Sequence, residues 1–295
     1  MKIMVCLVFT MIVLVVGCLG LESIYPLKVT RDVLTNGERT LVVEGMAHIG
    51  TPRFYADIRS SISKEKAAGA VYLYEGVRDE PAARLSEPAT INHKTTSAEI
   101  TDILVGENMQ DGVDIMRLYS VLAKSAGLEV QPQESFMDIA GGPDVNADMS
   151  AQELLTRLRT SRDLKTAHDT QIGASHPPVP TDPKSEKAHD SLDVDQLEVA
   201  LDKMSGSERT VVGFLVRGVM SFVVRVSDNM DVVPYSEDID KARTLRLAEF
   251  VQLRTEKRMV STYGSRHVDG LLDELRHLDS RWERTERTWR EPFVR

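Results

Sequence analysis

Residues 28–50 read KVTRDVLTNGERTLVVEGMAHIG, and this stretch decides the fold class. Two runs rich in β-branched residues surround Asn36-Gly37, a dipeptide that suits a type I′ turn because both central residues of that turn need positive φ. The second run passes directly into the glycine-flanked segment 45–50, and residues 55–68 predict a helix. A β-hairpin, a turn and then a helix are typical of the start of an α/β domain.

The rest of the chain continues to alternate strands and helices. We predict strands at residues 70–75, 128–131 and 258–264, and helices at 97–109, 111–126, 151–159, 192–204, 208–226 and 240–256. Loops are predicted at 79–96 and 133–148, and a Pro-rich loop at 175–189. The alternation predicts one α/β domain over residues 28–279, with a mainly parallel central sheet, flanking helices, an N-terminal β-hairpin and a helical insertion after the Pro-rich loop.

Residues 280–295 form a predicted C-terminal tail that carries both tryptophans and several arginines. If the preceding helix continues past Ser280, one apolar face would comprise Leu271, Leu275, Leu278, Trp282 and Trp289. The favoured interpretation is that this face packs on its own domain. A membrane surface or a partner helix is the alternative.

The N-terminus has the composition of an export signal, because a short basic start precedes an apolar run over residues 3–21. Residues 15–18 (VVGC) resemble a bacterial lipobox, in which the cysteine is lipidated before the signal is cleaved. On this interpretation residues 1–17 are a signal peptide, Cys18 is the lipidation site and residues 18–27 are a tether. An uncleaved helix that nearly spans a bilayer core of about 30 Å is one alternative, and plain secretion is the other.

These features predict a protein anchored to a membrane by a lipid or a helix, on the extracytoplasmic side of the bacterial cell envelope, in the periplasm or at the outer membrane. Cys6 and Cys18 are the two cysteines and both lie in the N-terminal segment, so we expect no disulfide in the mature domain. The chain has 295 residues, is 42% hydrophobic and has a formal net charge of -9. This charge provides no basic field for phosphate backbones, so we expect no nucleic-acid partner.

Three side chains with useful chemistry follow predicted strands. His48 comes after the hairpin, Glu75 ends the strand at 70–75, and His267 comes after the strand at 258–264. The carboxyl ends of the strands form the ligand-binding edge of α/β domains, so these side chains can meet if their strands are neighbours. Two neutral imidazoles and a carboxylate suit a divalent transition metal with open positions for water and substrate. The alternative for each Gly-x-x-His motif is a structural turn with a hydrogen-bonded imidazole.

Other polar residues are weaker candidates. Asp144, Asn146 and Asp148 alternate like calcium ligands, but the late glutamate of an EF-hand loop is missing. The remaining histidines of polar stretches have no partner at ligand spacing and are expected to be solvated: His93, His168, His176 and His189.

The motifs resemble those of the TraB/PrgY/GumN (Tiki-like) family. The resemblance is carried by LVVEGMAHIG at 41–50, YEG at 74–76 and YGSRHVDGL at 263–271, and Arg254 stands where the family has an arginine before its second histidine. It extends over residues 38–278. It implies an α/β fold of the type shared by erythromycin esterase and ChaN-like haem-binding lipoproteins and, in the Tiki branch, a metal-dependent peptidase.

The resemblance also implies roles for single residues. His48, His267 and Glu75 would ligate a divalent metal (Mn, Co, Zn or Fe) or orient its water, and Arg254 would fix Glu75 or stabilise a developing oxyanion. Gly45 and Gly264 are the motif glycines. We therefore expect hydrolysis of a peptide or protein in the envelope. The alternatives are a non-catalytic, haem-like ligand-binding lipoprotein and a scaffold that acts through the C-terminal tail.

Overall fold

The computed structural model describes residues 26–76, 115–131, 136, 138–160, 194–229 and 236–294. The strands are β1 (Val29–Thr35), β2 (Thr40–Met46), β3 (Ile49–Gly50), β4 (Val71–Tyr74), β5 (Glu129–Val130), β6 (Val145–Asn146), β7 (Arg258–Gly264) and β8 (Glu283–Arg290). The helices are α2 (Pro52–Ala67), α4 (Ile115–Ser125), α7 (Val194–Asp202), α8 (Gly206–Asn229), α9 (Ser236–Leu253) and α10 (Ser265–Leu278), and residues 151–160 are also helical.

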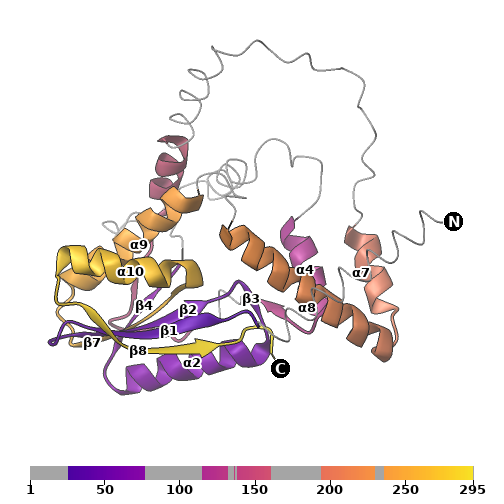
Figure 1. Cartoon of the computed structure of the whole chain (residues 1–295), viewed down its shortest axis with the longest axis horizontal. Coiled ribbons are helices and arrows are strands. Elements are labelled where there is room, and N and C mark those ends of the chain that lie inside the picture. Colours follow the sequence, from indigo (N-terminus) through magenta and orange to yellow (C-terminus); the bar gives the residue numbers. More distant parts are fainter. Residues whose placement is uncertain are drawn as a thin grey trace, which may run out of the picture.

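Six of these strands form one mixed sheet in the order β6-β4-β7-β2-β1-β8. The strands β6, β4, β7 and β2 pair in parallel, whereas β1 is antiparallel to both of its neighbours, β2 and β8. Helices cover both faces of the sheet (Figure 1). The predicted α/β class with a mainly parallel central sheet is therefore confirmed.

The sheet separates two apolar cores. One core lies between the sheet and α2 and contains Val42 and Val260, while the other lies against α9 and α10 and contains Val43 and Met259. Alternate residues of β2 and β7 enter different cores, which is why both strands are continuous apolar runs in the sequence. The central strands are consequently inaccessible on both faces, and their ends are the parts that can meet a ligand.

The N-terminal hairpin is confirmed, but its turn lies one residue later than predicted. Thr35 pairs with Thr40, and the Asn36 N–H donates to the Arg39 carbonyl at 3.2 Å, so Gly37 and Glu38 are the central residues. The prediction placed Asn36 at the centre of the turn. Asn36 instead stabilises the turn with its side chain, because its Oδ1 accepts hydrogen bonds from the Glu38 and Arg39 N–H groups.

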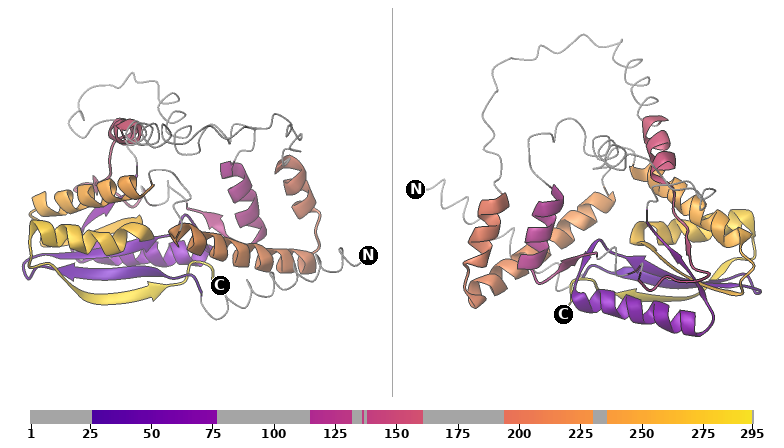
Figure 2. Two further views of the ribbon diagram at one scale, coloured as in Figure 1. Left: turned by 45° about the horizontal axis from the view of Figure 1, so that its top comes forward. Right: turned by 180° about the vertical axis from the view of Figure 1, so that it is seen from behind.

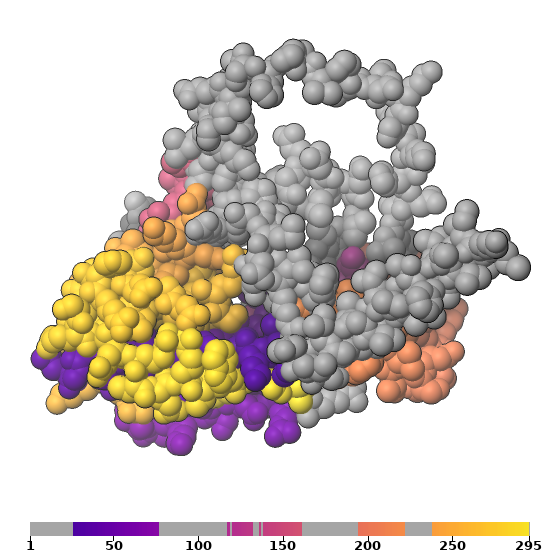
Figure 3. Space-filling view, in the orientation of Figure 1, coloured from indigo at the N-terminus to yellow at the C-terminus, as the bar shows by residue number. Residues whose placement is uncertain are grey.

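The prediction that residues 280–295 form a tail outside the α/β domain is wrong. Helix α10 ends at Leu278, and residues 283–290 form β8, which pairs with β1 at the edge of the sheet. Trp282 is 1% exposed in the core while Trp289 is 54% exposed, so the two rings do not share a face. The C-terminal α10 and β8 pack directly on the N-terminal strands (Figure 3). The many charged residues of β8 are typical of a protected edge strand, whereas the prediction applied a helical period to this segment.

Two smaller predictions also need correction. Residues 133–148, predicted as a loop, contain the edge strand β6, which pairs with β4. The predicted strand at 128–131 corresponds to β5, but it pairs with β3 in a separate two-stranded sheet. The predicted export signal, the loop at 79–96, the helix at 97–109 and the Pro-rich loop at 175–189 lie outside the described residues.

Helices α4, α7 and α8 lie together beside the sheet rather than on its faces (Figures 1 and 2). Gly213 permits the close contact between α8 and α4, because a Cβ atom there would lie 2.8 Å from the Ser125 carbonyl oxygen. Helices α7 and α8 follow the Pro-rich segment and correspond to the predicted helical insertion. Within the described parts of the chain, no helix is both long and apolar enough to span a membrane.

Candidate functional site

Three neighbouring parallel strands carry the predicted site residues to one edge of the sheet. Met46 at the end of β2 pairs with Gly264 at the end of β7, and Tyr74 at the end of β4 pairs with Thr262. The residues that follow these strand ends therefore begin at the same carboxyl edge. The two Gly-x-x-His motifs and the glutamate were expected to meet only if their strands are neighbours. The strands are neighbours in the sheet.

Glu75 and His267 come together around Gly264. The Gly264 N–H donates to Glu75 Oε2 at 2.6 Å, so the carboxylate caps the N-terminus of α10. A Cβ atom on Gly264 would lie 3.3 Å from His267 Cδ2 and 3.8 Å from Glu75 Oε2. The glycine of the second motif is thus the residue that lets this carboxylate and this imidazole approach each other.

The surroundings of His267 fix which ring nitrogen carries the proton. Nδ1 lies 2.8 Å from the Thr244 hydroxyl and 3.1 Å from the Asp240 carbonyl oxygen. A carbonyl can only accept, and the Thr244 hydroxyl already donates to the same carbonyl, so Nδ1–H is the donor. In the neutral ring Nε2 then has a free lone pair, and Nε2 lies 3.6 Å from Asp240 Oδ1.

The imidazole of His267 is held in its neutral form. The ring is 4% exposed, and this burial lowers its pKa below the ordinary value, with the nearby Arg243 guanidinium acting in the same direction. The carboxylates of Glu75 and Asp240 oppose this shift. A neutral imidazole with a fixed Nδ1 proton can accept a proton from water, or bind a metal, through Nε2.

Arg243 organises the acidic side of this site. Its guanidinium donates through Nη2 to Glu75 Oε1 at 2.5 Å and through Nε to Asp148 Oδ1 at 3.0 Å, with a further contact from Nη2 to Asp148 Oδ2. The pKa of Arg243 is raised because hydrogen bonding to Asp148 and the charges of both carboxylates outweigh burial, which alone would lower it. These hydrogen bonds from Arg243 fix the orientation of the Glu75 side chain.

The prediction that Arg254 fixes Glu75 is wrong. Arg254 follows α9 and precedes β7, at the opposite end of that strand from Gly264, where it pairs with Glu256 and donates to the Pro143 carbonyl. The arginine that contacts Glu75 is Arg243, which sequence reasoning missed. A signal was present: Asp240, Arg243 and Thr244 have the i, i+3, i+4 spacing of one helix face. Only the packing of α9 on α10 shows that this face meets His267.

His48 lies at the same edge but outside the buried cluster. It follows β2 in the short connection to β3, its side chain is exposed, and its carbonyl accepts a hydrogen bond from the Gln131 N–H at 2.7 Å. The first motif glycine, Gly45, has a structural role in β2, because a Cβ atom there would lie 2.5 Å from the Thr30 carbonyl oxygen of β1. The two histidine motifs thus differ in burial although their strands are adjacent.

Comparison with protein-family models, with curated proteins and with solved structures gives no match. The function of this chain is therefore inferred from its own sequence motifs and geometry.

The donor groups fit a divalent metal in type, although their arrangement is incomplete. Within the described ranges, no three His, Cys, Asp or Glu side chains are grouped in a way that could hold a metal ion. His267 Nε2 and the Glu75 carboxylate are nevertheless nitrogen and oxygen donors of the kind that such metals prefer. His48, which the sequence adds to this pair, lies on the exposed connection at the same edge.

Asp144, Asn146 and Asp148, the weak calcium candidates, form hydrogen bonds and ion pairs with other residues of the protein. Asp144 accepts from the Tyr72 and Gly141 N–H groups and pairs with Lys66, and Asn146 donates to the Gly76 carbonyl. Asp148 pairs with Arg243, as described above. These contacts hold β6 against β4 and account for the sequence pattern without calcium.

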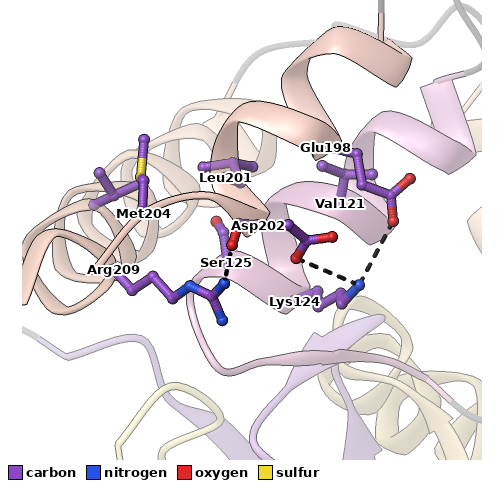
Figure 4. A pocket seen from close by; sticks show the side chains of 9 residues that line it. Val121, Lys124, Ser125, Glu198, Leu201, Asp202, Met204 and Arg209 are labelled. Atoms are coloured by element: carbon purple, nitrogen blue, oxygen red, sulfur yellow. Dashed lines mark hydrogen bonds and ion pairs between the residues drawn. The ribbon is translucent and has the colours of Figure 1, made fainter. Parts of the chain in front are cut away.

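A separate pocket lies between α4, α7 and α8 (Figure 4). Lys124 at its rim contacts Glu198 at 3.5 Å and Asp202 at 4.0 Å, and Val121 and Leu201 contribute apolar lining. None of the predicted site residues lines it. Lys124 pairs with Glu198 and Asp202, and Arg209 donates to the Asp202 backbone carbonyl, so the two cations and two carboxylates of the lining leave no excess charge.

Proposed function

We propose that this protein is an exported, membrane-anchored hydrolase of the bacterial cell envelope that acts on a peptide or protein. The proposal includes membership of the TraB/PrgY/GumN (Tiki-like) family and the erythromycin esterase/ChaN-like version of the α/β fold. The observation that carries it is the meeting of Glu75 with the neutral, Nδ1-protonated imidazole of His267 at the carboxyl ends of adjacent parallel strands.

The residues at this edge have complementary tasks. Nε2 of His267 accepts a proton or binds a metal, and Asp240 and Thr244 keep the ring oriented through Nδ1. Arg243 is a positioning residue that holds the Glu75 carboxylate. If the exposed connection brings His48 to His267 and Glu75, these three side chains would hold a divalent transition metal, and the metal would supply a water of lowered pKa as the nucleophile.

The first test measures the metal content of the full-length protein by inductively coupled plasma mass spectrometry. The protein is purified in detergent without chelator. We expect bound Mn, Co, Zn or Fe in the wild type and a loss of metal in His267→Ala and in His48→Ala. His277→Ala is the matched control, because His277 lies on the same helix as His267 with an exposed side chain. Equal metal content in all four proteins would rule out metal ligation by His48 and His267.

The second test is cleavage of a mixed peptide library by the metal-loaded, full-length protein. Glu75→Gln should abolish cleavage while leaving the far-ultraviolet circular dichroism unchanged, since the amide can still accept from the Gly264 N–H. Absence of any cleavage, together with a Soret band on titration with haem, would contradict the hydrolase and favour the ligand-binding alternative.

A further inference from the structure

Helix α8 carries apolar side chains on two of its sides. On one side Val212, Val216 and Met220 pack into the clusters formed with α4 and α7. Around the rest of the helix Val211, Phe214 and Val219, which span about 140° of its circumference at 100° per residue, are 59%, 44% and 51% exposed. A helix that is apolar on both sides usually has both sides covered. Within the described part of the chain, the second side of α8 remains open to solvent at these three residues.

The exposed side points away from the helices that α8 supports. Gly213 marks the side in contact with α4, and at about 100° per residue Val211 lies roughly opposite it, while Phe214 and Val219 lie about 100° and 120° from it. Figure 2 shows α4 and α7 rising from the same side of α8. The exposed apolar residues therefore do not belong to the packing between these helices.

The position of residue 27 limits how far α8 can be from a membrane. Leu27 packs in the same cluster as Val216 and Met220 of α8. If the apolar run over residues 3–21 is the anchor, six peptide units separate its end from Leu27, and these span at most about 20 Å at about 3.5 Å each. If a lipid on Cys18 is the anchor, the limit is about 30 Å. Either distance is smaller than the length of α8, about 36 Å for its 24 residues.

We propose that Val211, Phe214 and Val219 of α8 dock on the lipid surface of the membrane that anchors the chain. Arg209 and Arg217 interrupt the apolar sequence of α8, so the helix lies along the interface and does not cross the bilayer. The proposal depends on the membrane anchoring in the proposed function and is independent of the hydrolase activity. It also orients the domain, because one end of the molecule is held against the membrane.

The test uses full-length protein reconstituted into vesicles of phosphatidylethanolamine and phosphatidylglycerol, with or without bromine atoms on the acyl chains. Phe214→Trp introduces an indole at the proposed contact, and Val219→Trp provides a second position in case the first variant misfolds. Leu253→Trp is the matched control, since Leu253 is 81% exposed at the end of α9, in the layer that covers the sheet. The emission of wild-type protein, from Trp282 and Trp289, is subtracted from each spectrum.

We expect brominated lipid to quench the indole at position 214 or 219 and to leave the indole at position 253 unquenched. Equal quenching at positions 214, 219 and 253 would overturn the proposal. So would a blue-shifted emission at 214 without quenching, because another part of the chain or a second copy would then cover the site. Protein that fails to float with the vesicles would overturn both the anchor and the docking, whereas the metal and cleavage tests would stand separately.

Discussion

At Gly264, the absence of a side chain is what allows a carboxylate and an imidazole to occupy the same corner of the molecule. The Gly264 N–H also donates a hydrogen bond to Glu75. The backbone therefore holds the carboxylate, and the missing Cβ leaves space for the imidazole. Its backbone is not in the left-handed region, with φ at -47°, so steric space and not backbone freedom is the reason for glycine here.

We expect Gly264→Ala to lower the free energy of unfolding by about 1–3 kcal/mol, since the new methyl group would press on the His267 ring at 3.3 Å. Urea unfolding measures this loss, and the metal content should fall with it. Gly270→Ala on the same helix is the control, because its Cβ would meet Thr244 Cγ2 at 3.7 Å, an ordinary contact. There we expect no loss, or a gain of up to about 1 kcal/mol from helix propensity. Similar losses in both variants would contradict the steric explanation.

Arg243 and Arg254 should differ sharply in their contribution to stability. Removing the guanidinium in Arg243→Met leaves Asp148, which is fully buried, and Glu75 without their cation, so we expect a loss of about 3–5 kcal/mol. Arg254→Met breaks a more exposed pair with Glu256 and should cost about 1 kcal/mol or less. Urea unfolding of both variants decides this, and an Arg254→Met loss as large as that of Arg243→Met would refute the assignment.

Single residues of the candidate site could be predicted from the sequence where they belong to short motifs. Glu75 and His267 were predicted as partners and do meet at Gly264. Asp240, Arg243 and Thr244 were missed because their spacing shows only that they share a helix face, and not that this face contacts α10. Arg254 was selected by its spacing to His267, and spacing along the chain does not show at which end of a strand a residue lies.

At the scale of elements, β8 is the edge strand beside β1. Trp282, just before it, lies in the core, and Trp289, within it, lies at the surface. Trp282→Ala should cost about 3–5 kcal/mol because the ring is 1% exposed in the core. Trp289→Ala should change the stability by about 0.5 kcal/mol or less, since surface substitutions have small effects. Thermal or urea unfolding tests the pair, and a large effect of Trp289→Ala would contradict its surface position.

The connection between α10 and β8 is tied to the hairpin turn, and this tie should depend on pH. Hydrogen bonds from Arg281 and from Asn36 lower the pKa of Asp279 to about 2 from its ordinary 3.8. A depressed carboxyl pKa contributes stability that is complete above the ordinary value and is lost as the pH falls toward the folded-state value. We therefore expect Asp279→Asn to be less stable than wild type at pH 6, with a difference that shrinks toward pH 2.

Unfolding by urea at several pH values between 6 and 2 measures this difference. Asp273→Asn, an exposed position on α10, controls for the loss of one surface charge. A difference between Asp279→Asn and wild type that stays constant over this range would show that the charge of Asp279 is not responsible.

The elements themselves were largely predictable. The hairpin, β4, β7 and most helices follow from apolar periods and turn residues. The edge strands β6 and β8 were not predicted, because β6 has only two residues, β8 is mostly polar, and both pair with strands distant in the sequence. The apolar period of α10 also invited an extension past Leu278, where the chain in fact turns at Asp279 and Arg281.

At the scale of the whole molecule, the predicted anchor is the feature that sets the location. If residues 15–18 act as a lipobox, as we propose, we expect cells grown with a labelled fatty acid to incorporate the label into this protein at Cys18, whose thiol would be acylated. Cys18→Ser should lose the label and Cys6→Ser should keep it, as read by gel electrophoresis and by the mass of the mature N-terminus. Label retained in Cys18→Ser would contradict lipidation at this residue.

The strand order has a consequence for biogenesis. Because β7 lies between β2 and β4, a nascent chain that stops before residue 258 has its two earlier parallel strands separated by an empty position. The sheet can close only after nearly the whole polypeptide has been synthesised. Late completion of the sheet would suit the export that we propose, because a chain must be unfolded to pass through a secretion channel.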